Sequence, residues 1–329
     1  FILDDSTEKA FQIRVDAYAA KSPKRITVVR RTTRTGFKAG NLNFALKNVI
    51  THYPIFAVVD ADERLPEDFL SLTVPWLEKP GIAFAQACHM PNPRQESAFA
   101  HDIGPTIIPF WQVHCRPRNR YGSVVFMGHG ALMKYDAWEQ VGGFPEFVSE
   151  DFAFTMQLRE GGFQGVYLEH VICYEDFPVS YALFKQQQER YVSGSFEILL
   201  RRMGRLLRSK KVSLVEKLDF LLWSLPLYVP AIALFYVVLC CVGLSLAFGT
   251  WDVPTVVLMG KEITLFPLLV IHGPFEAMNS LDFRLFSVIC ALSPTLATIT
   301  VGLTGKLAGK RCIKLLALST VVYLSLMVT

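Results

Sequence analysis

The sequence lacks paired cysteines. Its seven cysteines are scattered along the chain, and no two of them stand in a Cys-x-x-Cys arrangement. A disulfide framework and a structural zinc site are therefore not expected. Cys240, Cys241 and Cys290 lie inside apolar runs, where cysteine behaves as a small hydrophobic residue.

The last third of the sequence is also poor in charge. Residues 212–329 contain 13 charged residues among 118, about 11%, whereas residues 1–211 contain 49, about 23%. The overall hydrophobic content of 51% is thus an average over two unlike parts. Disordered, collagen-like and coiled-coil classes are excluded by this composition. We predict a water-facing domain over residues 1–211 and a helical transmembrane domain over 212–329.

Three apolar runs predict the membrane-spanning helices. Leu225–Phe248 has 24 residues without a charge, Phe283–Leu303 is a second span, and Leu315–Met327 is a shortened third. Such lengths match the hydrocarbon thickness of a bilayer. Thr264–Ile271 is too short and predicts an interfacial or re-entrant segment.

Basic clusters orient these spans. The clusters within residues 201–211 and 306–314 fall on the same side of the membrane if two spans separate them. The positive-inside rule makes this the cytosolic side, so we predict a multi-pass protein of the plasma (cytoplasmic) membrane with a cytosolic first domain. The sequence opens as if inside a strand and closes inside an apolar run. We therefore expect it to be part of a longer chain.

Residues 1–211 alternate β-rich runs with helical patterns. Strands are expected at Ile2–Leu3, Ile26–Val29, Ile55–Val59 and Ile82–Ala87. The helices between them are expected to run to about Ala20, over Gly40–Val49, and from Pro66 to near Pro80. This alternation predicts an α/β, Rossmann-like domain with a mostly parallel sheet. Ligands bind such sheets at the carboxyl ends of strands, where Asp4, Asp5, Asp60 and Asp62 all follow a predicted strand.

Two acidic motifs suggest chemistry. Asp60-Ala61-Asp62 offers carboxylates that can share Mg²⁺ or Mn²⁺, although an isolated acidic pair is more often a solvated turn. Ser149 is a candidate N-cap that places Glu150 and Asp151 in the first turn of a helix. An ionised carboxylate is favoured there and could act as a general base, or could simply complement the helix dipole.

Two further motifs offer positive charge. Lys38 lies in a glycine-bracketed loop that enters a helix, where it could meet a diphosphate or remain a surface lysine. Gln187, Arg190 and Tyr191 are spaced to share one helix face. Together they would suit a diphosphate and a sugar, or form a polar surface helix.

In order along residues 1–211, these motifs resemble family 2 glycosyltransferases, particularly the cellulose-synthase-like processive branch. The resemblance covers Leu3-Asp4-Asp5, Lys38-Ala39-Gly40-Asn41-Leu42-Asn43, Asp60-Ala61-Asp62, Phe126-Met127-Gly128-His129-Gly130, Gly142-Gly143-Phe144, Ser149-Glu150-Asp151 and Gln187-x-x-Arg190-Tyr191. It implies a GT-A fold. The family has Trp at the position of Tyr191, and relatives often have a small or hydroxyl residue where His129 stands.

The resemblance also implies roles for individual residues. Asp4 and Asp5 would hold the nucleoside end of the donor, and Lys38 its diphosphate. Asp60 and Asp62 would serve the nucleotide and the Mg²⁺ or Mn²⁺ ion. Asp151, beside Glu150, would be the catalytic base. Gln187 and Arg190 would close over the donor, while His129 and Tyr191 would contact the acceptor.

The function expected from this resemblance is processive, inverting synthesis of a β-linked, glucan-like polysaccharide from a nucleotide sugar, UDP-linked by expectation. The polymer would then pass across the membrane. Two alternatives stay open: a non-processive enzyme that adds one sugar to a lipid, and a catalytically silent membrane scaffold. We expect no nucleic-acid partner, because the basic residues at 201–211 adjoin a membrane span and lack interleaved aromatics. Accessory subunits or an oligomer are possible partners.

Overall fold

The computed structural model describes residues 1–223, 255–258 and 261–264. The chain divides into two compact units, Phe1–Leu222 and Trp223–Thr329. The three predicted spans lie outside the described residues, as does the predicted re-entrant segment apart from its first residue. In the described part of the chain, no helix combines the length and apolar character needed to cross a bilayer. β7 (Thr255–Leu258) and β8 (Lys261–Thr264) form an antiparallel pair.

A four-stranded sheet lies at the centre of the first unit. Its order is β3 (Ile55–Val58), β5 (Ala131–Lys134), β4 (Ile82–Pro91) and β6 (Gln164–Glu175). β5 runs antiparallel to both of its neighbours, whereas β4 and β6 are parallel. The expectation of a mostly parallel sheet is therefore wrong, because β5 enters between β3 and β4 from the opposite direction. The fold is a mixed α/β domain of the GT-A type.

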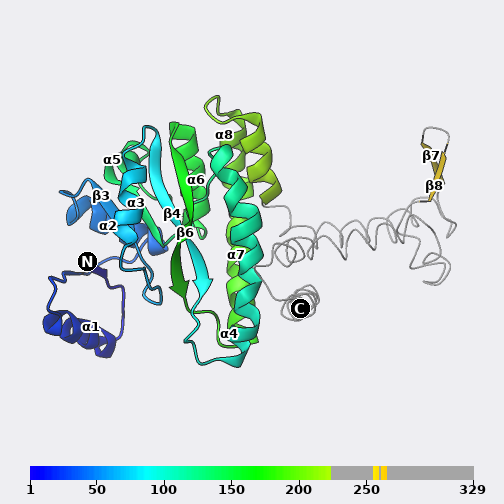
Figure 1. The fold of residues 1–329 in the computed structure, drawn as a ribbon. Helices are drawn as coiled ribbons and strands as arrows, with labels where there is room; N and C mark the ends of the chain where they lie inside the picture. Colours follow the sequence, from blue (N-terminus) through cyan, green and yellow to red (C-terminus); the bar gives the residue numbers. More distant parts are fainter. Residues whose placement is uncertain (224–254, 259–260, 265–329) are drawn as a thin grey trace. The chain divides into compact units, whose positions relative to one another are not determined.

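Both faces of this sheet are buried, and the side chains alternate between them as the pleat requires. On one face, α3 (Phe69–Leu77) packs against Ala85, Ala87 and Leu132. The other face is covered by α2 (Phe37–Asn48), α5 (Tyr135–Gln140) and α6 (Glu150–Gly161). The largest buried side chains of this second core include Trp138, Phe84 and Phe154. Figure 1 shows β4 and β6 side by side, with the long helix α7 (Tyr181–Arg201) beside them.

The first 30 residues form a smaller element of the same unit. β1 (Ile2–Leu3) pairs in parallel with β2 (Val28–Val29), and α1 (Lys9–Lys21) connects them. α1 buries none of its residues. The strands and the helix predicted for this segment are found. The next helix, α2, begins at Phe37, three residues before its expected start. Lys38 therefore lies in the first turn of α2 and not in a preceding loop.

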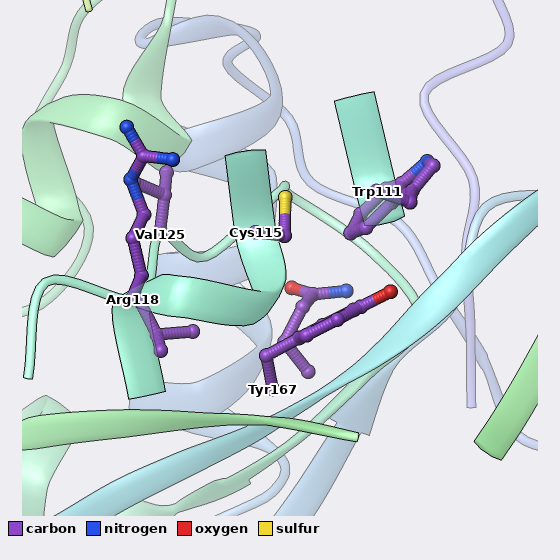
Figure 2. Close-up of a pocket in the computed structure, with 7 residues that line it drawn as sticks. Trp111, Cys115, Arg118, Val125 and Tyr167 are labelled. Carbon is purple, nitrogen blue, oxygen red and sulfur yellow. The ribbon is translucent and has the colours of Figure 1, made fainter. Parts of the chain in front are cut away.

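The connection between β4 and β5 is mostly helical. It contains α4 (Ala98–Ile103), two 3-10 segments at Gly104–Ile107 and Arg116–Arg120, and a π-helical segment at Phe110–Cys115. A narrow internal space lies beneath it, lined by Trp111, Cys115, Arg118 and Tyr167 among others (Figure 2). This space is too small for a water molecule, so we assign it to core packing and not to ligand binding.

The first unit ends with α8 (Met203–Arg208) and a helical segment at residues 214–223. Ser213 and Glu216 form a capping box for this last segment: Ser213 N–H donates to Glu216 Oε2 at 3.0 Å, and Glu216 N–H donates to Ser213 Oγ at 3.3 Å. Glu216 Oε1 also accepts from Arg159 of α6 at 2.6 Å. Both charged side chains are buried.

Replacing Glu216 with Ala is expected to lower the free energy of unfolding by about 3–5 kcal/mol, because the buried Arg159 guanidinium loses its partner. Denaturant unfolding of the full chain, followed by circular dichroism, measures this loss. Glu189→Ala is the matched control, since Glu189 forms only an exposed pair with Lys185; its loss should stay below about 1 kcal/mol. Equal losses in the two variants would show that the buried pair contributes no more to the free energy of unfolding than the exposed pair.

Candidate active site

An ion pair joins the start of α2 to the end of β3. Lys38 Nζ lies 2.5 Å from Asp60 Oδ1, and both side chains are partly exposed. Asp62, two residues further on, is exposed. The structure thus brings the predicted diphosphate-binding lysine and the predicted metal-binding pair together. Carboxylate oxygens are the donors that Mg²⁺ and Mn²⁺ prefer, so Asp60 and Asp62 fit such an ion.

The acidic pair of α6 faces the same place. Glu150 and Asp151 occupy the first turn of the helix, as predicted, and Ser149 is its N-cap residue, although the Ser149 side chain makes no capping hydrogen bond. Asp151 Oδ1 accepts from Phe152 N–H at 2.7 Å. A Cβ placed on Gly128 would lie 3.5 Å from Asp151 Oδ2 and 3.7 Å from Lys38 Nζ. Asp151 and Lys38 therefore converge on the backbone at Gly128.

These surroundings raise the pKa values of the acidic pair. Burial, together with the charge of Asp151, raises the pKa of Glu150 to about 7, although the nearby Lys38 opposes the shift. Burial also raises the pKa of Asp151, against the opposing effects of the Phe152 N–H and Lys38. A carboxylate whose pKa lies closer to neutrality is a stronger general base than an ordinary surface aspartate.

The backbone at 126–130 is held by three side chains. Phe126 N–H donates to Thr155 Oγ1 at 2.9 Å, and Met127 N–H donates to Gln86 Oε1 at 2.9 Å. Gly130 N–H donates to Glu63 Oε2 at 3.0 Å. These contacts join the segment to α6, to β4 and to the loop that follows β3. The close approach of Gly128 to the charged groups is thereby fixed.

α7 carries Gln187, Arg190 and Tyr191, of which Gln187 is half-buried and the other two are exposed. The Arg190 guanidinium lies 5.9 Å from the centre of the Tyr191 ring. Partial burial and the nearby carboxylates of Asp151 and Glu175 raise the pKa of Tyr191 to about 12. Tyr191 therefore belongs to the same charged neighbourhood as the acidic pair.

Two contacts dock α7 onto the residues that precede this pair. Val148 N–H donates to Glu197 Oε2 at 3.0 Å. A Cβ on Gly194 would stand only 2.1 Å from Ser149 Oγ, so the helix can approach this closely only with glycine at that position. α7 and the start of α6 are therefore packed as one piece.

Asp4 and Asp5 each form an ion pair with an arginine. Arg30 Nε donates to Asp4 Oδ2 at 2.8 Å, and Arg31 forms a two-pronged pair with Asp5. Asp4 is buried, which favours its neutral form, but hydrogen bonds from Ser6 and Arg30 outweigh this and lower its pKa. Both residues are thus members of ion pairs with arginine, and their predicted contact with the nucleoside stays a prediction.

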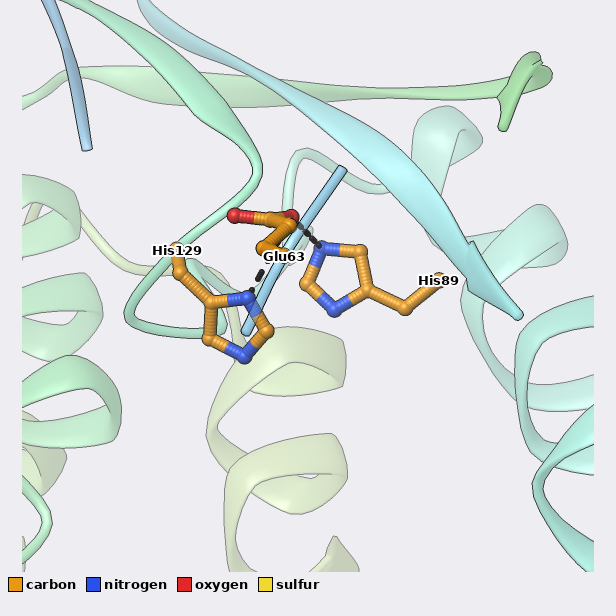
Figure 3. A group of neighbouring side chains, drawn as sticks. All are labelled: Glu63, His89 and His129. Carbon is orange, nitrogen blue, oxygen red and sulfur yellow. Dashed lines mark ion pairs between the residues drawn. The ribbon is translucent and has the colours of Figure 1, made fainter. Parts of the chain in front are cut away.

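Three residues that the motifs did not identify form a second cluster. Glu63 lies in the loop after β3, His89 on β4 and Glu175 at the end of β6, and His129 points into the group they form (Figure 3). The predicted acceptor contact of His129 remains a prediction, but its ring is mostly covered by these neighbours. The signals in the sequence were slight: Glu63 directly follows Asp62, and His89 interrupts an apolar strand.

Charge is unevenly shared within this cluster. Burial and the proximity of His129 hold the pKa of His89 well below its ordinary value. Burial also opposes charge on His129, but Glu63, Asp60 and Glu175 outweigh it and raise the pKa of that imidazole. Burial raises the pKa of Glu175 to about 7. The surroundings therefore disfavour a positive charge on His89 and favour one on His129.

The mixed α/β domain thus gathers a lysine, two aspartates and the Glu150–Asp151 pair, groups suited to an enzyme that acts on a diphosphate ester. The particular family follows from the sequence. Residues 55–271, about two thirds of the chain, match the model of glycosyl transferase family group 2. The chain belongs to this family, as its motifs predicted.

Named relatives come from plants. The chain is 26% identical over 238 residues to a probable glucomannan 4-beta-mannosyltransferase 10 of Arabidopsis thaliana, covering 68% of this chain and 42% of the relative. It is 26% identical over 236 residues to glucomannan 4-beta-mannosyltransferase 7 of the same plant, covering 66% and 40%. The chain thus spans about two fifths of the length of these relatives.

A similar solved structure is the mannosyltransferase PcManGT from Pyrobaculum calidifontis, determined in complex with GDP-Man and Mn²⁺. It is 19% identical, with a TM-score of 0.48, and the match covers 92% of this chain and 77% of that one.

Proposed function

We propose that this chain is the catalytic part of an inverting transferase that extends a β-linked polysaccharide from a nucleotide sugar. One observation carries the proposal: the Lys38–Asp60 pair and the Asp151 carboxylate approach the same backbone position, Gly128. A group that can bind a diphosphate and a group that can take a proton thus lie beside the same backbone position.

The donor end of the site is Lys38 with Asp60 and Asp62. Lys38 and Asp60 form an ion pair. A bound diphosphate would pair with Lys38 instead, and Asp60 and Asp62 would then hold a Mg²⁺ or Mn²⁺ ion. Such an ion supplies positive charge that stabilises a departing diphosphate. Gln187 and Arg190 of α7 stand at the exposed side of the site and are suited to close over the donor.

The acceptor end is Asp151. Its Oδ2 accepts the proton of an acceptor hydroxyl as that oxygen bonds to the anomeric carbon of the donor sugar. The bond from this carbon to the diphosphate breaks in the same step, and the electron pair leaves with the diphosphate. A single displacement inverts the anomeric carbon, so an α-linked donor gives a β-glycoside. Tyr191, whose ring lies near Asp151, is placed to pack against the acceptor sugar.

The donor is proposed from the names of the relatives. Those relatives are named glucomannan 4-beta-mannosyltransferases, so we propose a nucleotide-linked mannose as donor beside the UDP-linked glucose expected from the motifs. Both sugars would give a β-linked hexose polymer by the same displacement.

We also propose that the domain works at the cytosolic face of the plasma membrane and passes its product across. The support is the charge-free run at 225–248 and a row of exposed apolar side chains on the helices before it. Val192, Phe196 and Leu200 are 39%, 50% and 69% exposed at four-residue spacing along α7. Leu214, Leu218 and Leu222 repeat the pattern in the last helix. Apolar rows flanked by arginines and lysines suit the surface of an anionic bilayer.

Size analysis of the radiolabelled product tests processive synthesis. The full chain in membranes is supplied separately with GDP-mannose and UDP-glucose, and the product is treated with β-specific glycanases. A long polymer is expected from one donor at early times. A product of one added sugar on a lipid would support a non-processive transferase, and no transfer from any donor would support the silent scaffold.

The pH dependence of kcat/KM follows from the acidic pair. Because burial raises the pKa of Glu150 to about 7 and also raises that of Asp151, the pair takes up a proton as the pH falls below neutrality. Protonation of Asp151 removes the base, so kcat/KM should fall about tenfold per pH unit once the pH drops below the raised pKa of Asp151. A rate that stays constant from pH 8 down to pH 5 would contradict a base with a raised pKa.

Replacing Gly194 with Val is expected to reduce kcat about 10²-fold. The new side chain pushes α7 away from Ser149 and so displaces Asp151, the proposed base, from its position. Gly204→Val on α8 is the matched control, since a side chain there would meet no atom within 4 Å. Equal activity of the two variants, with both folded, would show that α7 does not position the base.

A further inference from the structure

A carboxylate and two imidazoles converge beside the proposed site. Glu63 Oε1 lies 3.5 Å from His89 Nε2 and 3.3 Å from His129 Nδ1. In Figure 3 one ring nitrogen of each histidine faces the Glu63 carboxylate. The Glu63 side chain is fully buried, and the ring of His89 is only 2% exposed. The three side chains come from the loop after β3, from β4 and from the segment before β5, and their ligand atoms lie close together.

These atoms stand too far apart for strong hydrogen bonds. Charge-assisted N–H···O contacts are about 2.7–2.9 Å long, and Glu63 Oε1 and His129 Nδ1 have no hydrogen-bond partner among the described residues. Ligands placed 2.0–2.1 Å from a zinc ion are separated by about 3.3 Å along a tetrahedral edge. The separations of Glu63 Oε1 from the two ring nitrogens therefore lie close to such an edge, and all three ligand atoms lie within 4.8 Å of one another.

The surroundings orient the ligand atoms. Glu63 Oε2 accepts from Gly130 N–H at 3.0 Å and from Asp60 N–H at 3.3 Å, which leaves Oε1 turned toward the imidazoles. Glu175 Oε2 lies 3.6 Å from His89 Nδ1 and 3.5 Å from His129 Nε2, the two ring nitrogens that face away from Glu63. A carboxylate behind a metal-binding histidine is the usual means of fixing its ring.

The backbone of Gly130 packs directly against this cluster. A Cβ on Gly130 would overlap His89 Nε2, at 2.2 Å, and Glu63 Oε1, at 2.4 Å. The Gln86 amide also donates to His89 Nε2 at 3.2 Å, but it has other acceptors in the carbonyls of Ala87, His129 and Gly130. It can therefore release the imidazole to a metal without being left unpaired.

We propose that Glu63, His89 and His129 bind a transition-metal cation of the Zn²⁺ class, at a site separate from Asp60 and Asp62. Two imidazoles and one carboxylate select such a borderline cation over Mg²⁺, which prefers oxygen ligands alone. The ion would tie the loop that carries Asp60 and Asp62 to β4 and to the Gly128 segment. The two rings are stacked with centroids 4.3 Å apart, so full coordination by both would require the more exposed ring, His129, to turn toward the ion.

Metal titration of the full chain tests this site. The purified protein is stripped with a chelator and titrated with Zn²⁺ by calorimetry, and with Co²⁺ by visible absorption, which reports nitrogen and oxygen ligation in a four-coordinate site. We expect one Zn²⁺ per chain. Glu175→Gln should weaken its binding about 10- to 100-fold, and His89→Gln or His129→Asn should weaken it more than that.

Two control variants keep the result specific. His101→Asn changes an exposed histidine outside the cluster, and Asp62→Asn changes the predicted hard-cation site; both should retain the Zn²⁺ stoichiometry. Circular dichroism identifies any variant that fails to fold, and the Co²⁺ spectrum of the unmodified chain does not depend on variants. Absence of stoichiometric Zn²⁺ binding by the unmodified chain overturns the proposal. Zn²⁺ binding that survives the folded double variant His89→Gln/His129→Asn overturns it as well.

Discussion

Replacing Asp151 with Asn is expected to reduce kcat about 10²–10⁴-fold while donor binding is retained. The amide matches the carboxylate in shape and can keep the contact with Phe152 N–H, but it cannot accept the acceptor's proton. Loss of a positioned general base has an effect of this order. Radiolabelled-sugar transfer measures kcat, and calorimetry with the nucleotide sugar measures donor binding.

Glu150→Gln is the matched comparison for this variant. Glu150 neighbours Asp151 in the same helical turn, but its 8% exposure leaves it little access to an acceptor. Its replacement removes a repelling charge and should mainly lower the pKa of Asp151, which moves the pH profile toward acid with a smaller loss of kcat. Near-normal turnover in Asp151→Asn would assign the base elsewhere.

Replacing Asp62 with Asn is expected to reduce kcat/KM on the order of 10²–10³-fold, because a group that stabilises charge on the departing diphosphate is lost with the cation it holds. Chelation of Mg²⁺ and Mn²⁺ should reduce the activity of the unmodified chain in the same way. Initial rates across a range of donor and Mn²⁺ concentrations measure both effects.

Asp68→Asn serves as the control for this second variant, because Asp68 is an exposed acid near Asp62 in sequence whose side chain does not cap α3. Its rate and its Mn²⁺ dependence should be unchanged. If Asp62→Asn kept the Mn²⁺ dependence of the unmodified chain, the cation would bind elsewhere. A rate that resisted chelation altogether would remove the cation from the reaction.

Local signals predicted much of the fold. The strand Ile55–Val58 could be predicted because it is a short apolar run followed by acidic residues. The helix α6 could be predicted from Ser149 and the acidic first turn that follows it. Such signals depend on neighbours within one turn or one pleat. The early start of α2 was missed because Phe37 and Gly36 adopt left-handed backbone conformations, which give the helix an abrupt entry.

Contacts between residues distant in sequence were harder to predict from the sequence. The antiparallel entry of β5 between β3 and β4 depends on packing of Ala131 and Met133 against side chains that are remote in sequence. Lys38, Asp60 and Asp151 come close together in the structure because these residues follow strands or begin helices at one edge of the sheet. Glu63, His89 and Glu175 have no motif of their own, and only the assembled sheet places them together.

The anomeric configuration of the product tests the central claim most directly, because a single displacement with Asp151 as the base allows only one outcome. The full chain is supplied with an α-linked nucleotide sugar, and the one-bond carbon–hydrogen coupling at the new linkage is measured by NMR. The account predicts β-linked product only. An α-linked product would mean two displacements or another mechanism, and would contradict it.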